Sequence, residues 1–398
     1  KAGSGTLTLS GTNIYTGTTT INAGTLIAAN TQALGTSAAP LSLGGGTLDL
    51  ATDTSITAYN TTVTATSTIV SNRATTGAGV TQTLGTLSIG AYTLNVTAGS
   101  NVASGTAGVT FGATTLTGNV TFNITNPASG TTLLTLGAIT NSANTVTLTG
   151  NGNFAQSGVW GDGAGGLKLG VSGGTVYSGT ATLNQANTFT GGVTINSGTV
   201  VAGVSNATTV SGAAGPSAYA ITLGDSAGAS ASLLVGSFTV SNPINLGSDA
   251  LGTLTIGNNG TTTAPTFSGA IALNGNNLTI SRTGTTGTMT LSGGITGTGN
   301  LTINNSGSSS TITFSTTAID NVGTITNTGS STGTTTISGG IGANVTGVIQ
   351  NSATCGLTLS SANTFTGGLT IKAGKVTGTV NGSYGNGGTI TIGDSSGN

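Results

Sequence analysis

The feature that most constrains this chain is a stretch of roughly 20 residues that its sequence contains three times, a period typical of repeat proteins. Each copy has an asparagine, an aromatic residue, a glycine, an isoleucine and a second glycine at the same spacing. These positions are Asn13, Tyr15, Gly17, Ile21 and Gly24, then Asn187, Phe189, Gly191, Ile195 and Gly198, then Asn363, Phe365, Gly367, Ile371 and Gly374. The recurrence predicts a solenoid, in which each repeat buries its apolar face only against its neighbours.

Each position in the repeat has an expected structural role. An asparagine suits a tight bend, where its amide bonds the backbone of its own coil or of the neighbouring one. The aromatic residue is large enough to fill a corner between two strands, so we expect core packing rather than a ligand platform. Gly17 and Gly24, with their equivalents, are expected in turns, and Leu7, Leu9 and Ile21 in the interior.

Short segments of strict alternation predict the strands. Aliphatic residues occupy one face and hydroxyl residues the other, and Gly or Asn bounds each segment. The segments are 6–9, 47–50, 86–89, 120–124, 145–148, 167–169, 221–223, 253–256, 301–303 and 389–392. The pattern indicates one buried face and one face that water wets through Thr and Ser.

Two all-β architectures fit such strands. An antiparallel sandwich or barrel needs hairpin turns and a varied core. Here the inward residues are nearly uniform, only 5 of the 398 residues are proline, and matching segments recur far apart. We therefore predict an all-β fold, a right-handed parallel β-helix (β-solenoid), with coils of roughly 20 residues.

A larger period is also present. The motif and part of its surroundings recur, which predicts super-repeats over about 1–180 and 181–356 and the start of a third over 357–398. No linker composition separates them, so we expect one continuous β-solenoid over 1–398. The chain starts without methionine and stops partway through a repeat, and we interpret it as a fragment of a longer chain.

The composition argues against an enzyme. Charged residues are 3% of the chain, histidine is absent and all seven acids are aspartates. A hydrolase or lyase needs paired carboxylates with a base nearby, and the best candidates are Asp49 and Asp53 with Arg73. An aspartate that caps a turn explains both acids more simply, so we expect no catalytic residue.

The sequence also has few residues of the kinds that bind metals, cofactors or nucleic acid. Asp162, Asp225 and Asp394 are lone acids in glycine-rich turns, whereas calcium takes several oxygen ligands, and no histidine is present for zinc. We expect no cofactor-binding residue and no metal site. Six scattered bases do not form a nucleic-acid footprint, and no apolar run is long enough to span a membrane. The single cysteine, Cys355, is expected to be a small buried filler.

The first copy also resembles a known family. The pattern Lys1-x-Gly3-x-Gly5-Thr-Leu-Thr-Leu-Ser-Gly-x-Asn13-x-Tyr15-Thr-Gly17, followed by Ile21 and Gly24-Thr-Leu, is similar to the autotransporter-associated β-strand repeat, also called the passenger-associated transport repeat. The resemblance implies a right-handed β-helix on a very large secreted or surface-attached bacterial protein, often an adhesin or a fibre. It places the chain at the bacterial outer cell surface.

Two hypotheses about function follow. The first is a structural segment of an extracellular fibre, stalk or filament, whose partners are further repeats of the same polypeptide or other copies of it. The second is an adhesin passenger that binds glycans or the surfaces of other cells. Segments 98–115, 154–180 and 202–220 are the candidate loops for it, and Trp160 and Tyr177 are the aromatic residues that could contact a sugar or close the bore.

Overall fold

The fold is a stack of short parallel strands. The computed structural model describes residues 1–161, 163–206, 211–226, 228–247, 251–260 and 263–393. This part of the chain contains no helix, and therefore none long and apolar enough to cross a membrane. The predicted all-β parallel β-solenoid is confirmed. The right-handed turn of its coils and its continuity over 1–398 stay predictions, and the contacts divide the chain into two compact units, Lys1–Gly192 and Val193–Asn398.

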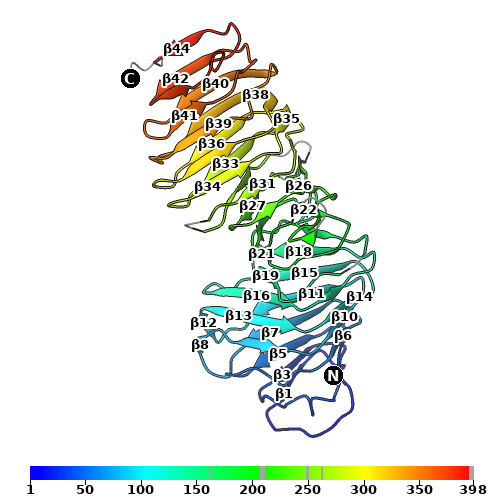
Figure 1. The fold of residues 1–398 in the computed structure, drawn as a ribbon. Coiled ribbons are helices and arrows are strands. Elements are labelled where there is room, and N and C mark those ends of the chain that lie inside the picture. The colour runs from blue at the N-terminus through cyan, green and yellow to red at the C-terminus, as the bar shows by residue number, and fades with distance from the viewer. Residues whose placement is uncertain (162, 207–210, 227, 248–250, 261–262, 394–398) are drawn as a thin grey trace. The chain divides into compact units, whose positions relative to one another are not determined.

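The first unit contains three stacks of parallel strands (Figure 1). One stack consists of β1 (Thr6–Leu9), β3 (Thr25–Ala28), β5 (Thr47–Ala51), β7 (Ser67–Asn72), β11 (Thr93–Ala98), β15 (Val120–Thr125), β18 (Val146–Gly150) and β20 (Leu167–Leu169). The next consists of β2 (Thr19–Ile21), β4 (Leu41–Leu43), β6 (Thr61–Val63), β10 (Leu87–Ile89), β14 (Thr114–Leu116) and β17 (Ile139–Thr140). The third consists of β9 (Thr81–Thr83), β13 (Thr106–Phe111), β16 (Thr131–Leu136), β19 (Asn153–Gln156) and β21 (Thr180–Leu183). A small parallel pair, β8 (Gly77–Ala78) and β12 (Val102–Ser104), lies outside these stacks.

The second unit repeats this plan. Its first stack is β22 (Val193–Ile195), β26 (Ile221–Leu223), β29 (Ile244–Leu246), β32 (Ile271–Ala272), β35 (Ile295–Thr298) and the start of β38 (Ile319–Thr328). The second is β23 (Gly198–Ala202), β27 (Ala231–Val235), β30 (Leu254–Asn258), β33 (Leu278–Arg282), β36 (Leu301–Asn305), the end of β38, β40 (Val345–Asn351), β42 (Leu369–Ala373) and β44 (Ile390–Ile392). The third is β28 (Thr239–Val240), β31 (Thr266–Phe267), β34 (Thr288–Leu291), β37 (Thr311–Phe314), β39 (Thr334–Ile337), β41 (Gly356–Leu359) and β43 (Val376–Gly378). An antiparallel pair, β24 (Ser211–Gly212) and β25 (Gly215–Pro216), lies in a corner.

The parallel register places like residues above one another. In β30, β33 and β36, Ile256, Ile280 and Ile303 are successive partners, and all three are fully buried. On the outward face of the third stack the register aligns an unbroken row of threonines, which are Thr239, Thr266, Thr290, Thr313, Thr336, Thr358 and Thr377. Alternation with period two therefore separates a dry aliphatic interior from a hydroxyl surface.

The coils are longer and less uniform than the roughly 20 residues expected. Hydrogen bonds that link neighbouring coils join residues from 19 positions apart, as between Lys1 and Thr20, to 36 positions apart, as between Asn206 and Asn242. Most strand pairs stay in register because the surplus residues lie in the corners between strands, and register shifts occur within the pairs β8–β12, β38–β40 and β40–β42. Corner residues do not alternate with period two, so a coil length judged from the alternating segments leaves them out.

The interior of the second unit also holds polar side chains. Arg282, Asn305, Asn327 and Gln350 are fully buried, and so is Cys355, as the sequence predicts. The Asn327 amide donates to the Gln350 side chain at 2.7 Å and to the Cys355 carbonyl at 3.1 Å. The Arg282 guanidinium donates to the backbone carbonyls of Thr263 and Thr286, and burial lowers its pKa. Backbone and amide partners satisfy most of these polar atoms, whereas Nε of Arg282 and Oδ1 of Asn327 have no hydrogen-bond partner among the described residues.

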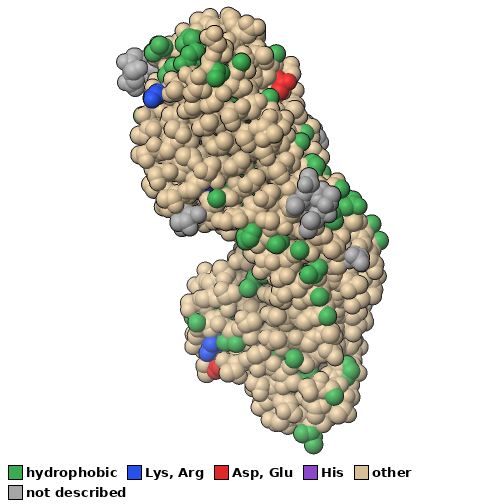
Figure 2. All heavy atoms as spheres, viewed as in Figure 1, with side chains coloured by type: hydrophobic (Ala, Val, Ile, Leu, Met, Phe, Trp, Pro, Cys, Tyr) green, Lys and Arg blue, Asp and Glu red, His purple; other side chains and the backbone are tan. Residues whose placement is uncertain are grey.

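The surface carries few charges. Figure 2 shows one face, on which Lys, Arg and Asp side chains are rare and hydrophobic side chains are scattered. The described residues contain one ion pair, between Arg73 and Asp53 at 3.1 Å. Hydroxyl and amide groups therefore supply most of the polar surface.

The column of isoleucines predicts which positions carry the stability. Ile280→Ala should lower the free energy of unfolding by about 2–5 kcal/mol, because the cavity opens between two neighbours that cannot close it. Urea unfolding followed by circular dichroism measures this. Thr279→Ala, on the outward face next to it, is the matched control and should cost no more than about 1 kcal/mol. Equal costs for the two variants would contradict the assignment of inward and outward faces.

Candidate functional site

The asparagine and aromatic positions of the repeat lie at the corners of the coils, whereas the isoleucines lie in strands. The asparagines join one coil to the next. Asn187 is fully buried. Its Oδ1 accepts from the backbone N–H of Trp160 at 2.9 Å and from Nε2 of Gln156 at 2.8 Å, and its Nδ2 donates to Oε1 of Gln156 at 3.1 Å. Gln156 and Trp160 belong to the preceding coil, so this one side chain closes three hydrogen bonds between coils.

The other two asparagines make the same kind of connection. Oδ1 of Asn363 accepts from the N–H of Ile341 in the coil before it at 2.7 Å, and its Nδ2 donates to the carbonyl of Ser383 in the coil after it. Nδ2 of Asn13 donates to the carbonyl of Ala33 at 2.7 Å. The amide therefore replaces backbone pairing where the chain bends between strands.

The aromatic positions differ between the copies. Phe189 and Phe365 are fully buried, and the Phe189 ring packs against Trp160 with ring centroids 5.0 Å apart. Tyr15 is 40% exposed, contrary to the expectation that it fills a corner, and its hydroxyl bonds Thr19 at 2.8 Å. It belongs to the first described coil, which is covered from one side only. Leu7 is 45% exposed for the same reason, because β1 pairs only with β3 in the described residues.

The second glycines share one backbone conformation in all three copies, whereas the isoleucines differ in burial. Ile21 and Ile195 are fully buried, whereas Ile371 is half-buried in β42. Gly24, Gly198 and Gly374 have φ values of +67°, +80° and +76°. This left-handed backbone is costly for any residue with a Cβ atom, which explains a glycine at this position in every copy.

The first glycine is required for a different reason. A Cβ atom on Gly191 would lie 2.4 Å from the carbonyl oxygen of Ala164, and one on Gly367 would lie 1.8 Å from that of Thr346. The neighbouring coil therefore leaves no room for a side chain. Gly17, in the first described coil, has no atom within 4 Å of this position.

The structure separates the two candidate acids by their surroundings. Asp49 is half-buried on β5, and burial raises its pKa above the ordinary value against a hydrogen bond from Asn72 at 3.2 Å. Asp53 is exposed, and hydrogen bonds from the side chain and backbone of Thr75 lower its pKa, with a further contribution from Arg73. Asp53 thus holds the turn around Thr75, the capping role expected of it.

The other acids form no metal-binding cluster within the part of the chain that the structure describes. The described residues include no group of three or more Asp or Cys side chains with metal-binding spacing. Asp225 is buried in the turn after β26. Asp162 and Asp394 lie outside the described residues.

The three candidate loops do not present the aromatic residues singled out for ligand contact. Segment 98–115 forms β12 and β13 rather than a free loop. In segment 154–180, Trp160 and Tyr177 are fully buried, and burial raises the pKa of Tyr177. Both therefore line the bore, and Trp160 is not a sugar platform. Segment 202–220 includes β24 and β25 and exposes Tyr219, while 207–210 lie outside the described residues.

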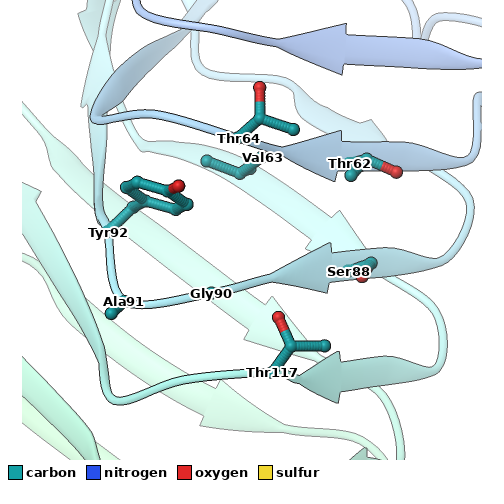
Figure 3. Close-up of a pocket in the computed structure, with 8 residues that line it drawn as sticks. All are labelled: Thr62, Val63, Thr64, Ser88, Gly90, Ala91, Tyr92 and Thr117. Carbon is teal, nitrogen blue, oxygen red and sulfur yellow. The ribbon is translucent and has the colours of Figure 1, made fainter.

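The structure reveals a surface hollow that the sequence did not indicate. We call it the Tyr92 hollow; it measures about 430 Å³, and Thr62, Thr64, Ser88, Gly90, Tyr92 and Thr117 line it. Figure 3 shows Tyr92 on the turn after β10, with Thr62 and Thr64 on one neighbouring coil and Thr117 on the other. Tyr92 lies two residues before the inward-facing Leu94 and four before Val96, so alternation with period two predicts that it faces the interior. It is instead 39% exposed, because it lies at a corner before β11 begins.

The contacts of Asn187 generate a prediction about stability. Asn187→Ala leaves the Trp160 N–H and the Gln156 amide buried without these partners, which should cost about 2–5 kcal/mol of folding free energy. Asn184→Ala, on an exposed position of the same coil, is the matched control and should have little effect. Chemical denaturation of both variants tests this. A cost below that of the control would mean that Asn187 does not join the coils.

The two acids predict opposite responses to pH. The raised pKa of Asp49 means that its charged form destabilises the fold, so stability falls as pH rises from below 3.8 through that raised pKa. Asp49→Asn should therefore raise the melting temperature at pH 7 and lose this gain below pH 3.8. The lowered pKa of Asp53 means that its charged form stabilises the fold. This stabilisation is fully present above pH 3.8 and is lost as pH falls through the lowered pKa, so Asp53→Asn should lower the melting temperature at pH 7 only. Melting curves at pH 7 and below pH 3.8 measure these changes. A change of melting temperature in the same direction for both variants at pH 7 would contradict the prediction.

The comparisons with known proteins agree with the geometry of the repeat. A sequence model of the passenger-associated-transport-repeat family matches residues 1–28, 176–202 and 356–377. No curated protein and no solved structure matches the chain. The three matches contain the three sets of repeat positions, and the combination of this repeat with a β-solenoid fits the passenger domain of an autotransporter. The chain therefore contains three copies of the passenger-associated transport repeat within a β-solenoid.

Proposed function

We propose that the chain is a structural segment of a secreted or surface-attached bacterial passenger, in which the β-solenoid forms part of a fibre, stalk or filament. The observation that supports this most is the use of the repeat side chains. Asn187 and Asn363 bond one coil to the next, and Phe189 and Phe365 fill the interior. The recurring residues therefore hold coils together rather than surround a ligand.

The partners of such a segment are further coils. Inner coils of each unit are paired through their backbone to the coils before and after them, whereas β1 and β44 pair on one side only in the described residues. Further repeats of the same polypeptide, or other copies of it, would extend the same hydrogen bonding. The surface suits an extracellular position, because its hydroxyl and amide groups stay neutral whatever the pH outside the cell.

An adhesin that binds glycans is the second candidate function. The observation that favours it is the Tyr92 hollow, where an exposed aromatic ring lies beside several hydroxyl groups. This candidate concerns a surface that the solenoid carries, and the two functions are compatible in one protein.

The surface position is tested in cells that make this protein. A cysteine at the exposed position Asn184 (Asn184→Cys) should react with a maleimide that cannot cross membranes when intact cells are treated. The unchanged protein is the control, because Cys355 is fully buried and should stay unlabelled. Labelling only after lysis would overturn the proposed surface position.

The structural role is tested by removing one coil from the labelled protein. Thr290 and Thr313 are partners on neighbouring strands, so deletion of residues 290–312 joins equivalent positions. We expect the shortened protein to reach the surface and to be labelled as well as the full one. Removal of residues 290–300 alone joins positions that are not equivalent in neighbouring coils, so it should abolish surface labelling. Loss of surface labelling after removal of the whole coil would contradict a role as a repetitive spacer.

A further inference from the structure

The Tyr92 hollow has the features of a small binding site. It lies across three neighbouring coils, because Thr62, Ser88 and Thr115 are successive partners on β6, β10 and β14. Its volume of about 430 Å³ is in the range of ligand pockets, although the hollow is open to solvent. Its lining residues belong to β6, β10 and the turns after β6, β10 and β14, so the stacked strands fix its shape (Figure 3).

The Tyr92 ring is held in position at the edge of this hollow. The backbone N–H of Tyr92 donates to the Gly90 carbonyl at 2.8 Å, and its carbonyl accepts from the N–H of Thr121 at 3.1 Å. A Cβ atom on Gly90 would lie 3.3 Å from ring atom Cε2, so the absence of a side chain at Gly90 lets the ring lie close to the strand end. The backbone of Tyr92 is thus fixed beside the hollow, and its ring, which is 39% exposed, is accessible to a ligand.

The polar groups of the hollow are available to a ligand. The hydroxyls of Tyr92, Thr62, Ser88 and Thr117 make no hydrogen bond to the described residues, so they can donate to or accept from a ligand. None of the residues that line the hollow is charged. A phosphate, a sulfate or an acidic sugar would find no counter-charge there, and nucleic acid no cation.

The chemistry of the hollow also argues against a peptide. β10 is paired on both sides, to β6 and to β14, so its backbone offers no free edge to an added strand. What remains is one flat aromatic face with hydroxyl groups around it. A neutral sugar ring complements both parts, because it has an apolar C–H face and a rim of hydroxyls that donate and accept hydrogen bonds.

We propose that the Tyr92 hollow is a subsite for neutral glycans, in which a sugar ring stacks on Tyr92 and its hydroxyls bond Thr62, Ser88 and Thr117. Binding at one such open site is weak, on the order of millimolar, because little of the ligand is buried. Many copies on one cell surface increase the overall affinity through multivalency. The inference rests on the second candidate function, an adhesin that binds glycans, and names its ligand class; it does not depend on the proposed structural function.

Saturation-transfer NMR on the purified chain tests the proposal with neutral trisaccharides of glucose, mannose, galactose and N-acetylglucosamine, and with a sialylated trisaccharide for comparison. We expect at least one neutral sugar to bind at concentrations up to about 10 mM and the sialylated one to bind no better. Tyr92→Ala should weaken binding at least about tenfold, which is the size expected for loss of a stacking partner. Tyr92→Phe should keep it within about threefold, since the aromatic face remains.

Controls separate loss of the subsite from loss of the fold. Tyr219→Ala removes another exposed tyrosine, far along the sequence in the second unit, and should leave binding unchanged. Thr62→Val keeps the shape of the strand and should weaken binding without a change in the urea midpoint. The proposal is overturned if no neutral sugar binds, if the sialylated sugar alone binds, or if folded Tyr92→Ala binds like the unchanged chain. A failure on any of these points leaves the surface-labelling experiment unaffected.

Discussion

Every part of this structure depends on the hydrogen bonding between parallel strands of neighbouring coils. A coil contributes only a few inward side chains, such as Ile280 from β33, and has no core of its own. Its burial is completed by Ile256 on one side and Ile303 on the other. Each fully buried aliphatic side chain contributes about 1.5–3 kcal/mol to folding, and it is fully buried only when both neighbouring coils are present. The stability of a coil therefore comes from the interfaces that it shares with its neighbours.

The polar residues inside the solenoid follow from the same constraint. A coil that turns three corners leaves backbone groups without strand partners, and these groups need hydrogen bonds when they are buried. Asn187 supplies them in the first unit and Asn363 in the second, while Asn327 and Gln350 bond each other and the Cys355 carbonyl. Since an unpaired buried amide is costly, such side chains also fix which coil lies against which corner.

The sequence predicts the strands well because alternation is a direct consequence of strand geometry. The segments 167–169 and 221–223 coincide with β20 and β26. The corners are less predictable, since loop length and side-chain direction there depend on the neighbouring coil. This explains why the coil length was underestimated, why Trp160 lies in the bore, and why Tyr92 lies outside although its phase matches Leu94. The repeat glycines were recognisable, but only the structure distinguishes the left-handed backbone of Gly374 from the close approach at Gly367.

The burial of Arg282 has a consequence for digestion by proteases. Enzymes that cut after lysine or arginine need such a residue on an accessible, flexible segment. Between Lys168 and Lys372 the sequence has one basic residue, Arg282, and its guanidinium is bonded to backbone carbonyls inside the solenoid. Trypsin-like enzymes therefore find no accessible basic residue along the folded chain between these two lysines. Cleavage after Arg282 should therefore require unfolding, so a tryptic cut at this residue would report that the second unit has opened.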